Sequence, residues 1–486
     1  MNLSINTLDI AIIMAYLLAV LALGLWIGRG QRDAADYFLG GRSLPWWALL
    51  LSIVATETST VTFLSVPSMS WKSDHGDLSF LQITFGYIVG RIVVARVLLP
   101  LYFRGAPFTA YEVLQSRFGK ATRRAASALF LITRNLSDAL RLYLTALVLQ
   151  AVLGLDMAAC IVVLGFITIL YTFVGGAKSV IWNDCVQFVI YMLGAAAAGV
   201  ILVQSLPGGW GQMIQFAQDH QKFHLFDFDL SLSKTTVTFW SGLIGGMFLT
   251  MATHGTDQLM VQRYLAARKE QDAALALVCS GLIVCLQFAI FLLLGVGLAC
   301  FYANYPPQTP LSQGDKVFAH FIVQNMPIGL TGLTLAAVFA AAMSTLSSSL
   351  NSSATALVSD LLLPLRREPM SPQAQLRVAR IATVLFGLLQ ILIAMMSGRF
   401  GATESTVMSV LAIAGFATGP VLGLYWLAVF TRTVQQTSAL VGFGVGLLVL
   451  SGLAYGTNLS SLWYAVVGSL TTLLAGWLAQ RLMFDV

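Results

Sequence analysis

Long apolar runs, separated by short polar connections, organise this chain from end to end. The runs lie at about 8–28, 45–66, 79–103, 123–152, 157–174, 179–205, 237–254, 272–303, 327–360, 378–398, 404–430, 436–455 and 460–482. An α-helix needs about 20 such residues to cross the hydrocarbon core of a bilayer. The pattern therefore predicts an all-α integral membrane protein with about thirteen transmembrane helices. We expect the two longest connections, 206–236 and 304–326, to form short surface helices.

The composition agrees with this pattern and excludes a soluble protein. The 486 residues are 57% hydrophobic and 10% charged, with a mean hydropathy of +0.81. A soluble domain is about 25% charged, and the missing charge has to be matched by a lipid environment. Because the connections are short, we interpret 1–486 as a single domain, either a transporter or a channel.

The distribution of basic residues predicts the orientation. The chain has 27 Lys and Arg residues against 21 Asp and Glu, an excess that in a soluble protein could indicate nucleic-acid binding. Here two thirds of the basic residues fall in connections on one side, which the positive-inside rule identifies as the cytoplasm. We therefore expect a multi-pass protein of the plasma membrane with its N-terminus outside and its C-terminus cytoplasmic. No Lys or Arg precedes the first run, so we expect that span to be retained.

Polar residues interrupt the second run. Within 55–62, six of eight side chains are hydroxyl or acidic, including Glu57. A polar group in hydrocarbon costs free energy unless it is paired or lines a wet cavity. The pattern favours an unwound segment beside a binding cavity over the alternative, an intact helix whose Ser and Thr side chains bond back to its own carbonyls.

Two further clusters of polar residues lie inside apolar runs. In the ninth run, Ala341, Ser344, Thr345 and Ser348 share one helix face and offer neutral oxygen ligands suited to a small alkali cation. The alternative is a face of small residues that lets two helices pack closely. In the sixth run, Asp184 needs a cation or a proton at its depth, and an ion pair with Lys178 is the structural alternative.

Four long segments carry a family pattern in a defined order. They are DYFLGGRSLPWWALLLSIVATETSTVTFLSVP at 36–67, YTFVGGAKSVIWNDCVQ at 171–187, GTDQLMVQRYLAARKEQDA at 255–273 and MPIGLTGLTLAAVFAAAMSTLSSSLNSS at 326–353. Together they resemble the sodium:solute symporter family of sodium-coupled sugar, sialic acid, proline and monocarboxylate carriers. The resemblance extends over essentially the whole chain. It implies a LeuT-type fold, in which two inverted five-helix repeats build a site near the membrane midplane from discontinuous helices.

The resemblance also implies boundaries and ion ligands. It makes 8–28 an extra first span, 45–205 the first five-helix repeat, 237–430 the second, inverted repeat and 436–482 two C-terminal spans. It implies one sodium site formed by the carbonyls of Ala55, Thr58 and Ala341 and the hydroxyls of Ser344 and Thr345. A second sodium site, known from sialic acid carriers of the family, maps onto Asp184, Ser344, Ser347 and Ser348.

The resemblance places solute contacts on the broken second and seventh spans and on the third and fourth. The candidates are Glu57, Ser59, Thr62, Gln82, Thr84, Arg134, Asp138, Arg141 and His254. Ser137 stands where sialic acid carriers have a carboxylate-binding arginine, which departs from that subfamily. Arg134 and Arg141 could supply a displaced guanidinium, or both could be neutralised by Asp138 on the same helix.

Glu57 and His254 leave alternatives open. An acid at the position of Glu57 occurs in proline carriers of the family and would suit a zwitterion, but Glu57 could instead pair with Arg91 of the third span. His254 could touch the solute or pack as a helix-break residue.

The function implied is sodium-coupled symport with alternating access. The solute would be a small polar organic molecule, such as an amino acid or other zwitterion, an organic acid, or a sugar or sialic-acid-like compound. The alternative is a proton-coupled carrier of the same fold with Asp184 or Glu57 as the titrating group. The chain lacks the HExxH and GxSxG motifs and is not expected to be an enzyme. We expect sodium ions, the solute and membrane lipid as partners, no nucleic acid, and a functional monomer.

Overall fold

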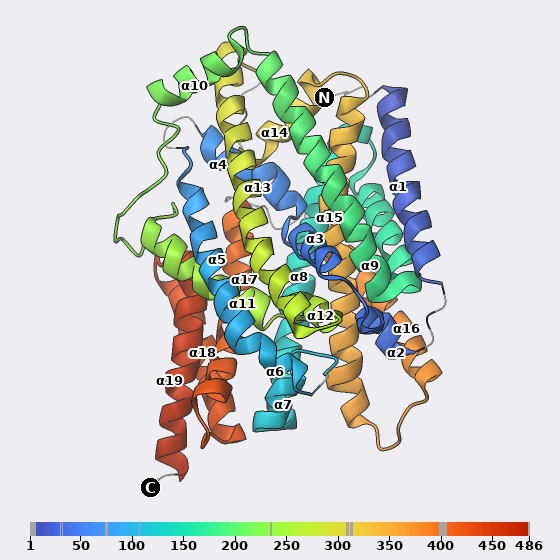
Figure 1. Cartoon of the computed structure of the whole chain (residues 1–486), viewed down its shortest axis with the longest axis vertical. Coiled ribbons are helices and arrows are strands. Elements are labelled where there is room, and N and C mark those ends of the chain that lie inside the picture. Colours follow the sequence, from blue (N-terminus) through green and yellow to red (C-terminus); the bar gives the residue numbers. More distant parts are fainter. Residues whose placement is uncertain are drawn as a thin grey trace.

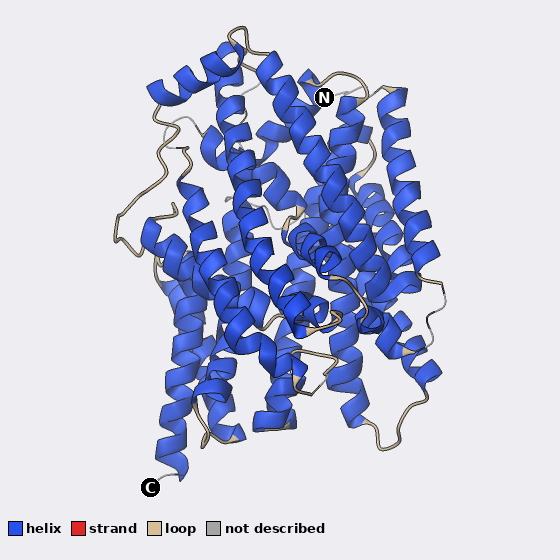
Figure 2. Cartoon of the chain, in the orientation of Figure 1, coloured by secondary structure: helices blue, strands red, loops and turns tan. Residues whose placement is uncertain are grey.

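The computed structural model describes residues 6–29, 31, 33–72, 76–105, 107–233, 236–307, 311, 314–397 and 406–484. These residues form helices and loops without a β-sheet (Figure 2). The bundle is built from α1 (Thr7–Ile27), α3 (Trp46–Glu57), α4 (Thr60–Trp71), α5 (Gln82–Val93), α6 (Leu99–Phe103), α8 (Lys120–Leu153), α9 (Met157–Gln204), α11 (Gly246–Gly255), α12 (Gln258–Leu265), α13 (Glu270–Asn304), α15 (Leu330–Ala356), α16 (Pro372–Ser397), α17 (Thr406–Phe430), α18 (Gln436–Gly456) and α19 (Tyr464–Phe484).

Short helices lie in the connections. They are α2 (Ala34–Leu39), α7 (Glu112–Phe118), α10 (Gly209–Asp219) and α14 (Val317–Asn325). The last two confirm the prediction that the connections 206–236 and 304–326 contain helix. In α10 and α14 the buried side chains are mainly apolar, so each helix covers the bundle with one face.

Nine helical segments of the described chain are long and apolar enough to span a membrane, or ten if the bent pair of α3 and α4 counts as one span. The all-α membrane class is confirmed, while the number thirteen stays a prediction. The start of the predicted span 404–430 and the end of 378–398 lie outside the described residues. Two predicted spans are missing from the nine because α8 carries several charged side chains and α11 is only ten residues long.

The helix α9 is too long to be one span. Its 48 residues would extend about 72 Å at 1.5 Å per residue, more than twice the thickness of the hydrocarbon core. Gly176 divides it, with non-helical backbone angles of φ 54° and ψ −159°. A Cβ at this position would lie 2.5 Å from the carbonyl oxygen of Tyr37, so only glycine fits. This division agrees with the two separate apolar runs predicted at 157–174 and 179–205.

The second span is broken. Helices α3 and α4 meet at an angle of 64°, and Thr58 between them has φ −82° and ψ 89°. The Ser59 amide donates to the carbonyl of Glu57, a contact that a regular helix does not make. The predicted unwinding is therefore confirmed at Thr58 and Ser59, while the residues on either side stay helical. The break frees backbone carbonyls of the last turn of α3.

The helix α15 occupies the centre of the molecule (Figure 1). Its side chains are buried along nearly the whole length, and it packs closely along α9. At its start, the amides of Gly329 and Gly332 donate to the carboxylate of Asp9 on α1, each at 2.7 Å. A carboxylate at a helix N-terminus is stabilised by the helix dipole. The first helix, α1, thus binds the N-terminal end of α15. Helices α18 and α19 lie at the opposite edge of the bundle (Figure 1).

Candidate functional site

A cavity of about 150 Å³ lies between the two helix breaks. One break separates α3 from α4, and the other, at Thr256 and Asp257, separates α11 from α12. Helices α5, α8, α13 and α17 also contribute to the wall. Six of the residues proposed for solute binding line the cavity: Glu57, Ser59, Thr62, Arg134, Arg141 and His254.

Aromatic and aliphatic side chains form most of the remaining wall. Phe80, Tyr87, Phe130 and Phe288 belong to this group, and the motif analysis did not identify them. Bulky apolar residues are frequent in every span, so nothing in the sequence distinguishes those facing the cavity from those facing other helices. Such a wall, with a few converging polar groups, is typical of a small-molecule site.

The other three candidates for solute binding are engaged elsewhere. The amide of Gln82 donates to the carbonyls of Ser79 and Val237 at 3.0 and 3.1 Å, and Thr84 donates to the carbonyl of Leu81 at 2.7 Å. Asp138 is buried behind the cavity wall and bonded to arginines. The structure does not bring these three side chains to the cavity surface.

Two arginines share one aspartate on α8. Arg134 donates to both carboxylate oxygens of Asp138 at 2.6 and 2.5 Å, and Arg141 donates to the same carboxylate at 2.5 Å. The predicted intrahelical pairs are therefore present. Both arginines also line the cavity, with side chains 11% and 13% exposed, and the buried Nε of Arg141 has no hydrogen-bond partner among the described residues. Asp138 thus bonds to both cations of the cavity wall, which also contains the carboxylate of Asp257.

Glu57 is ion-paired. Its carboxylate lies 2.5 Å from Nη2 of Arg91, which is fully buried, and 3.5 Å from Nε2 of His254. Arg91 also donates to the hydroxyl of Ser280 at 2.7 Å. The structure confirms the pairing of Glu57 with Arg91 that the sequence left as one of two possibilities. Glu57 still reaches the cavity surface, but its charge is already balanced.

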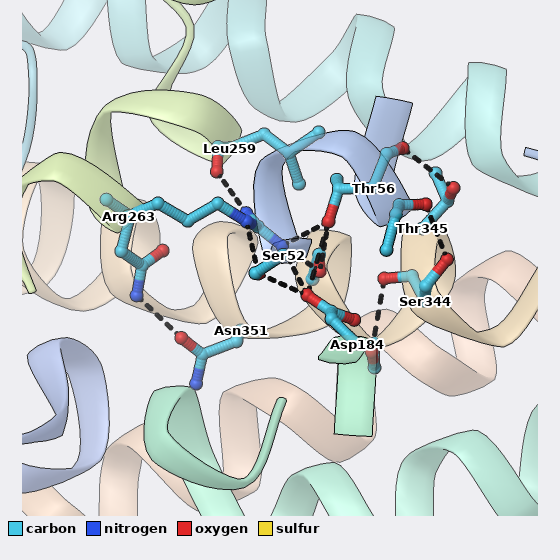
Figure 3. A network of polar contacts seen from close by, with 12 residues as sticks. Ser52, Thr56, Asp184, Leu259, Arg263, Ser344, Thr345 and Asn351 are labelled. Carbon is cyan, nitrogen blue, oxygen red and sulfur yellow. Dashed lines mark hydrogen bonds and ion pairs between the residues drawn. The ribbon is translucent and has the colours of Figure 1, made fainter. Parts of the chain in front are cut away.

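Ser344 and Thr345 of α15, two proposed ligands of the first sodium site, lie against the last turn of α3 (Figure 3). Ser344 donates to the carbonyl of Ala55 at 2.8 Å, and Thr345 donates to the carbonyl of Thr56 at 2.9 Å. The carbonyl of Ala341 accepts from both hydroxyls at 3.1 and 3.5 Å.

These groups are suited to an alkali cation. Thr58 lies at the break itself, and its hydroxyl donates to Gln287 at 2.9 Å. Hydroxyl oxygens and carbonyls released by a helix break are the neutral, hard ligands that sodium requires, and unwound carbonyls serve this purpose in transporters with broken helices. The donor set therefore fits a sodium ion bridging α3 and α15.

Asp184 forms the centre of a second polar cluster (Figure 3). Its Oδ2 accepts from Ser52 at 2.5 Å, from Thr56 at 3.3 Å and from Arg263 at 3.1 Å. Its Oδ1 is buried without a hydrogen-bond partner among the described residues. Ser348 accepts from Arg263.

Two other proposed ligands of the second sodium site, Ser344 and Ser347, are close to each other. Ser347 donates to the carbonyl of Ser344 at 3.3 Å, within the same turn of α15. The free carboxylate oxygen of Asp184 and the nearby hydroxyls of α15 fit a second sodium ion.

The expected alternative for Asp184, an ion pair with Lys178, is wrong. Lys178 is exposed, and the partner of Asp184 is Arg263 on α12. Arg263 follows the seventh apolar run in the sequence and lies in α12. The break at Asp257 turns α12 so that Arg263 is only 5% exposed. The signal that could have found it was the need of a buried carboxylate for a cation.

The comparisons with known proteins agree with this geometry. The sequence profile of the sodium:solute symporter family matches residues 37–446. The sodium/sialic acid symporter SiaT of Proteus mirabilis is 29% identical over 485 residues, which cover 98% of this chain and 95% of that protein. The human sodium/iodide cotransporter is 31% identical over 468 residues, which cover 93% of this chain and 70% of that protein.

A solved structure is similar along the whole chain. It is the substrate-bound outward-open state of a sodium-coupled sialic acid symporter, with a TM-score of 0.90 and 29% sequence identity. The match covers 98% of this chain and 98% of that one. The likeness confirms the LeuT-type fold that the sequence predicted.

Proposed function

This chain belongs to the sodium:solute symporter family, and we propose that it imports a small organic anion together with sodium by alternating access. Family membership makes the protein a sodium-coupled membrane transporter of a small solute and not an enzyme. The observation that supports an anion is the pair of arginines, Arg134 and Arg141, that line the cavity with Asp138 between them.

The charges around the cavity favour an anion over a zwitterion. Glu57, the acid that could receive an ammonium group, is already paired with Arg91. Asp257, another carboxylate of the cavity wall, caps α12 and accepts from the amide of Leu259 at 2.8 Å. A guanidinium binds a planar carboxylate through two parallel hydrogen bonds, which gives orientation as well as affinity.

The relatives support the same charge class. One is a symporter of sialic acid and another a cotransporter of iodide, both of which are negatively charged at neutral pH. We do not propose sialic acid as the solute, because Ser137 stands at the position where the resemblance places the carboxylate-binding arginine of sialic acid carriers. The apolar part of the wall suits a solute with a compact hydrocarbon body and one acidic group.

We propose that one sodium ion binds Ala55, Thr58, Ala341, Ser344 and Thr345. A second would bind Asp184, Ser344, Ser347 and Ser348. The first ion would hold the broken second span against α15 and so shape the solute cavity. A ligand that binds one arrangement of helices more tightly shifts the population toward it, which couples sodium binding to solute binding. Loss of the ion to the cytoplasm would favour inward opening and release.

We favour sodium over protons as the coupling ion. The proton-coupled alternative needs Asp184 or Glu57 to gain and lose a proton during each cycle. Each carboxylate is ion-paired with a buried arginine, at 3.1 Å to Arg263 and 2.5 Å to Arg91. Protonation of either carboxylate would leave its arginine buried without an anionic partner, which is strongly unfavourable.

The decisive experiment is uptake into proteoliposomes driven by an inward sodium gradient at constant pH. Small monocarboxylates, zwitterionic amino acids and neutral sugars are compared at equal concentration. We expect saturable uptake of a monocarboxylate that disappears when potassium replaces sodium. Uptake driven equally well by a pH gradient without sodium, or restricted to neutral sugars, would contradict the proposal.

The orientation and the repeats are proposed as well. We propose that the N-terminus lies outside, the C-terminus lies in the cytoplasm, 45–205 and 237–430 are the inverted repeats, and the monomer is functional in the plasma membrane. Single cysteines replacing His220 and Arg367, both exposed, would report on opposite sides of the membrane. Labelling of both by the same impermeant reagent in intact cells would refute this topology.

A further inference from the structure

The guanidinium of Arg263 bonds to two of the groups that the second sodium site would use, the carboxylate of Asp184 through Oδ2 and the hydroxyl of Ser348 (Figure 3). Its Nη2 donates to Asp184 at 3.1 Å and also to the hydroxyls of Thr56 and Ser348. Its Nε donates to Ser52 at 2.9 Å, and that hydroxyl in turn donates to Asp184. Building on the second sodium site of the proposed function, we propose that Arg263 is an internal cation that competes with sodium for Asp184.

The competition follows from the charge of the cluster. Asp184 is fully buried and supplies the single negative charge, and Arg263 is 5% exposed and supplies the single positive charge. A sodium ion that bound Asp184 and Ser348 would lie within a few ångströms of the guanidinium. Two like charges at that distance, away from water, repel strongly, and one carboxylate cannot balance both. Sodium therefore enters this site only as Arg263 leaves it.

Arg263 keeps the empty site neutral. A buried carboxylate without a partner is strongly unfavourable, so loss of sodium from an otherwise uncharged site would be opposed. The guanidinium replaces the departing ion and lowers the affinity of the site for sodium. A site of high sodium affinity would release its ion slowly. Competition by Arg263 therefore suits a carrier that has to release sodium in each transport cycle.

Replacement of the Arg263 guanidinium by sodium also changes the contacts of α12 with its neighbours. Through Arg263, this short helix is tied to Ser52 and Thr56 of α3, to Asp184 of α9 and to Ser348 of α15. When sodium displaces the guanidinium, these contacts are lost together. Binding energies linked in this way are reciprocal, so an arrangement that withdraws α12 would raise the sodium affinity of Asp184.

The first test replaces Arg263 and measures sodium binding through stability. Thermal unfolding of the purified protein is followed as sodium chloride replaces choline chloride at constant ionic strength. For Arg263→Gln we expect the sodium concentration that gives half of the stabilisation to fall at least tenfold below that of the wild type. Adding Asp184→Asn should abolish the gain. A sodium requirement equal to or above that of the wild type in Arg263→Gln would overturn the proposal.

Two control variants test the charge of residue 263 and the contribution of the first sodium site separately. Arg263→Lys keeps a cation, so its sodium requirement should stay within about threefold of the wild type, well short of the tenfold change that ~1.4 kcal/mol gives. Thr345→Ala weakens only the first sodium site. If sodium stabilises none of the variants or the wild type, the proposed sodium symport fails. If sodium acts through Thr345 but not through Asp184, only the competition fails.

The second test needs no variant at position 263 and covers the case in which Arg263→Gln does not fold. Hydrogen exchange of the wild-type protein is measured with and without sodium, and potassium serves as the control. We expect sodium to increase exchange in α12, residues Gln258–Leu265, because it releases the contacts of Arg263. The increase should be absent in Asp184→Asn. Unchanged or slower exchange in α12 on addition of sodium would overturn the proposal.

Discussion

The Glu57–Arg91 pair makes a quantitative prediction about the helix break. Replacing Glu57 by Gln leaves Arg91 charged and fully buried, with Ser280 as its remaining short contact at 2.7 Å. Breaking a buried ion pair from one side costs about 3 to 5 kcal/mol. Because the Glu57 side chain is 15% exposed, we expect the lower end, a loss of about 3 kcal/mol in the free energy of unfolding. That loss corresponds to roughly a 150-fold change in the unfolding equilibrium.

The assay is equilibrium unfolding of the purified protein in a denaturing detergent, followed by tryptophan fluorescence. The matched control is the double variant Glu57→Gln with Arg91→Met, which removes both charges. We expect it to recover much of the stability lost in the single variant, because no uncompensated charge remains. If Glu57→Gln unfolds like the wild type and only raises the KM for the solute, Glu57 is a solute ligand and the structural reasoning is refuted.

Three further variants test the ion site, the solute site and the packing. Thr345→Ala should raise the half-saturating sodium concentration for uptake about tenfold. Thr345→Ser retains the hydroxyl and should keep the wild-type value. Equal sodium dependence in the two variants would show that Thr345 is not a sodium ligand. Arg141→Gln should raise the KM for an organic anion roughly 10- to 100-fold, with a smaller change in Arg141→Lys, and unchanged KM would exclude a contact. Gly295→Ala should lower the thermal midpoint, since its Cβ would lie 1.9 Å from the carbonyl of Pro67, whereas Gly444→Ala meets nothing within 4 Å and serves as the control whose midpoint should not fall.

The fold could be predicted well because hydrophobic length and charge are local properties. Each apolar run is long enough to indicate a helix in lipid by itself, without knowledge of its neighbours. The break of the second span was also visible, since Glu57 and the surrounding hydroxyls have no place in an intact lipid-facing helix. The number of spans was harder to establish, because α8 carries Arg134, Asp138 and Arg141 inside an apolar run and α11 is only ten residues long.

The partners of buried charges could not be predicted in the same way. Sequence spacing suggested Lys178 for Asp184, because the two residues lie on one helix, yet the cation comes from Arg263, 79 positions away. Glu57 and Arg91 were correctly named as possible partners, but the alternative of a solute contact had equal standing. Whether a buried charge is paired depends on which helices meet at its depth, and that information is absent from any single segment.

The amino-acid sequence by itself determined the membrane environment, the helical class and the chemical types of the candidate sodium ligands. Those follow from which residues are apolar and which polar residues interrupt them. Only the tertiary structure decided that Ser344 and Thr345 face the carbonyls of the broken span, and that Arg263 occupies the oxygens around Asp184. The physical reason is that burial makes each charge find a partner, while the packing of distant helices selects which one.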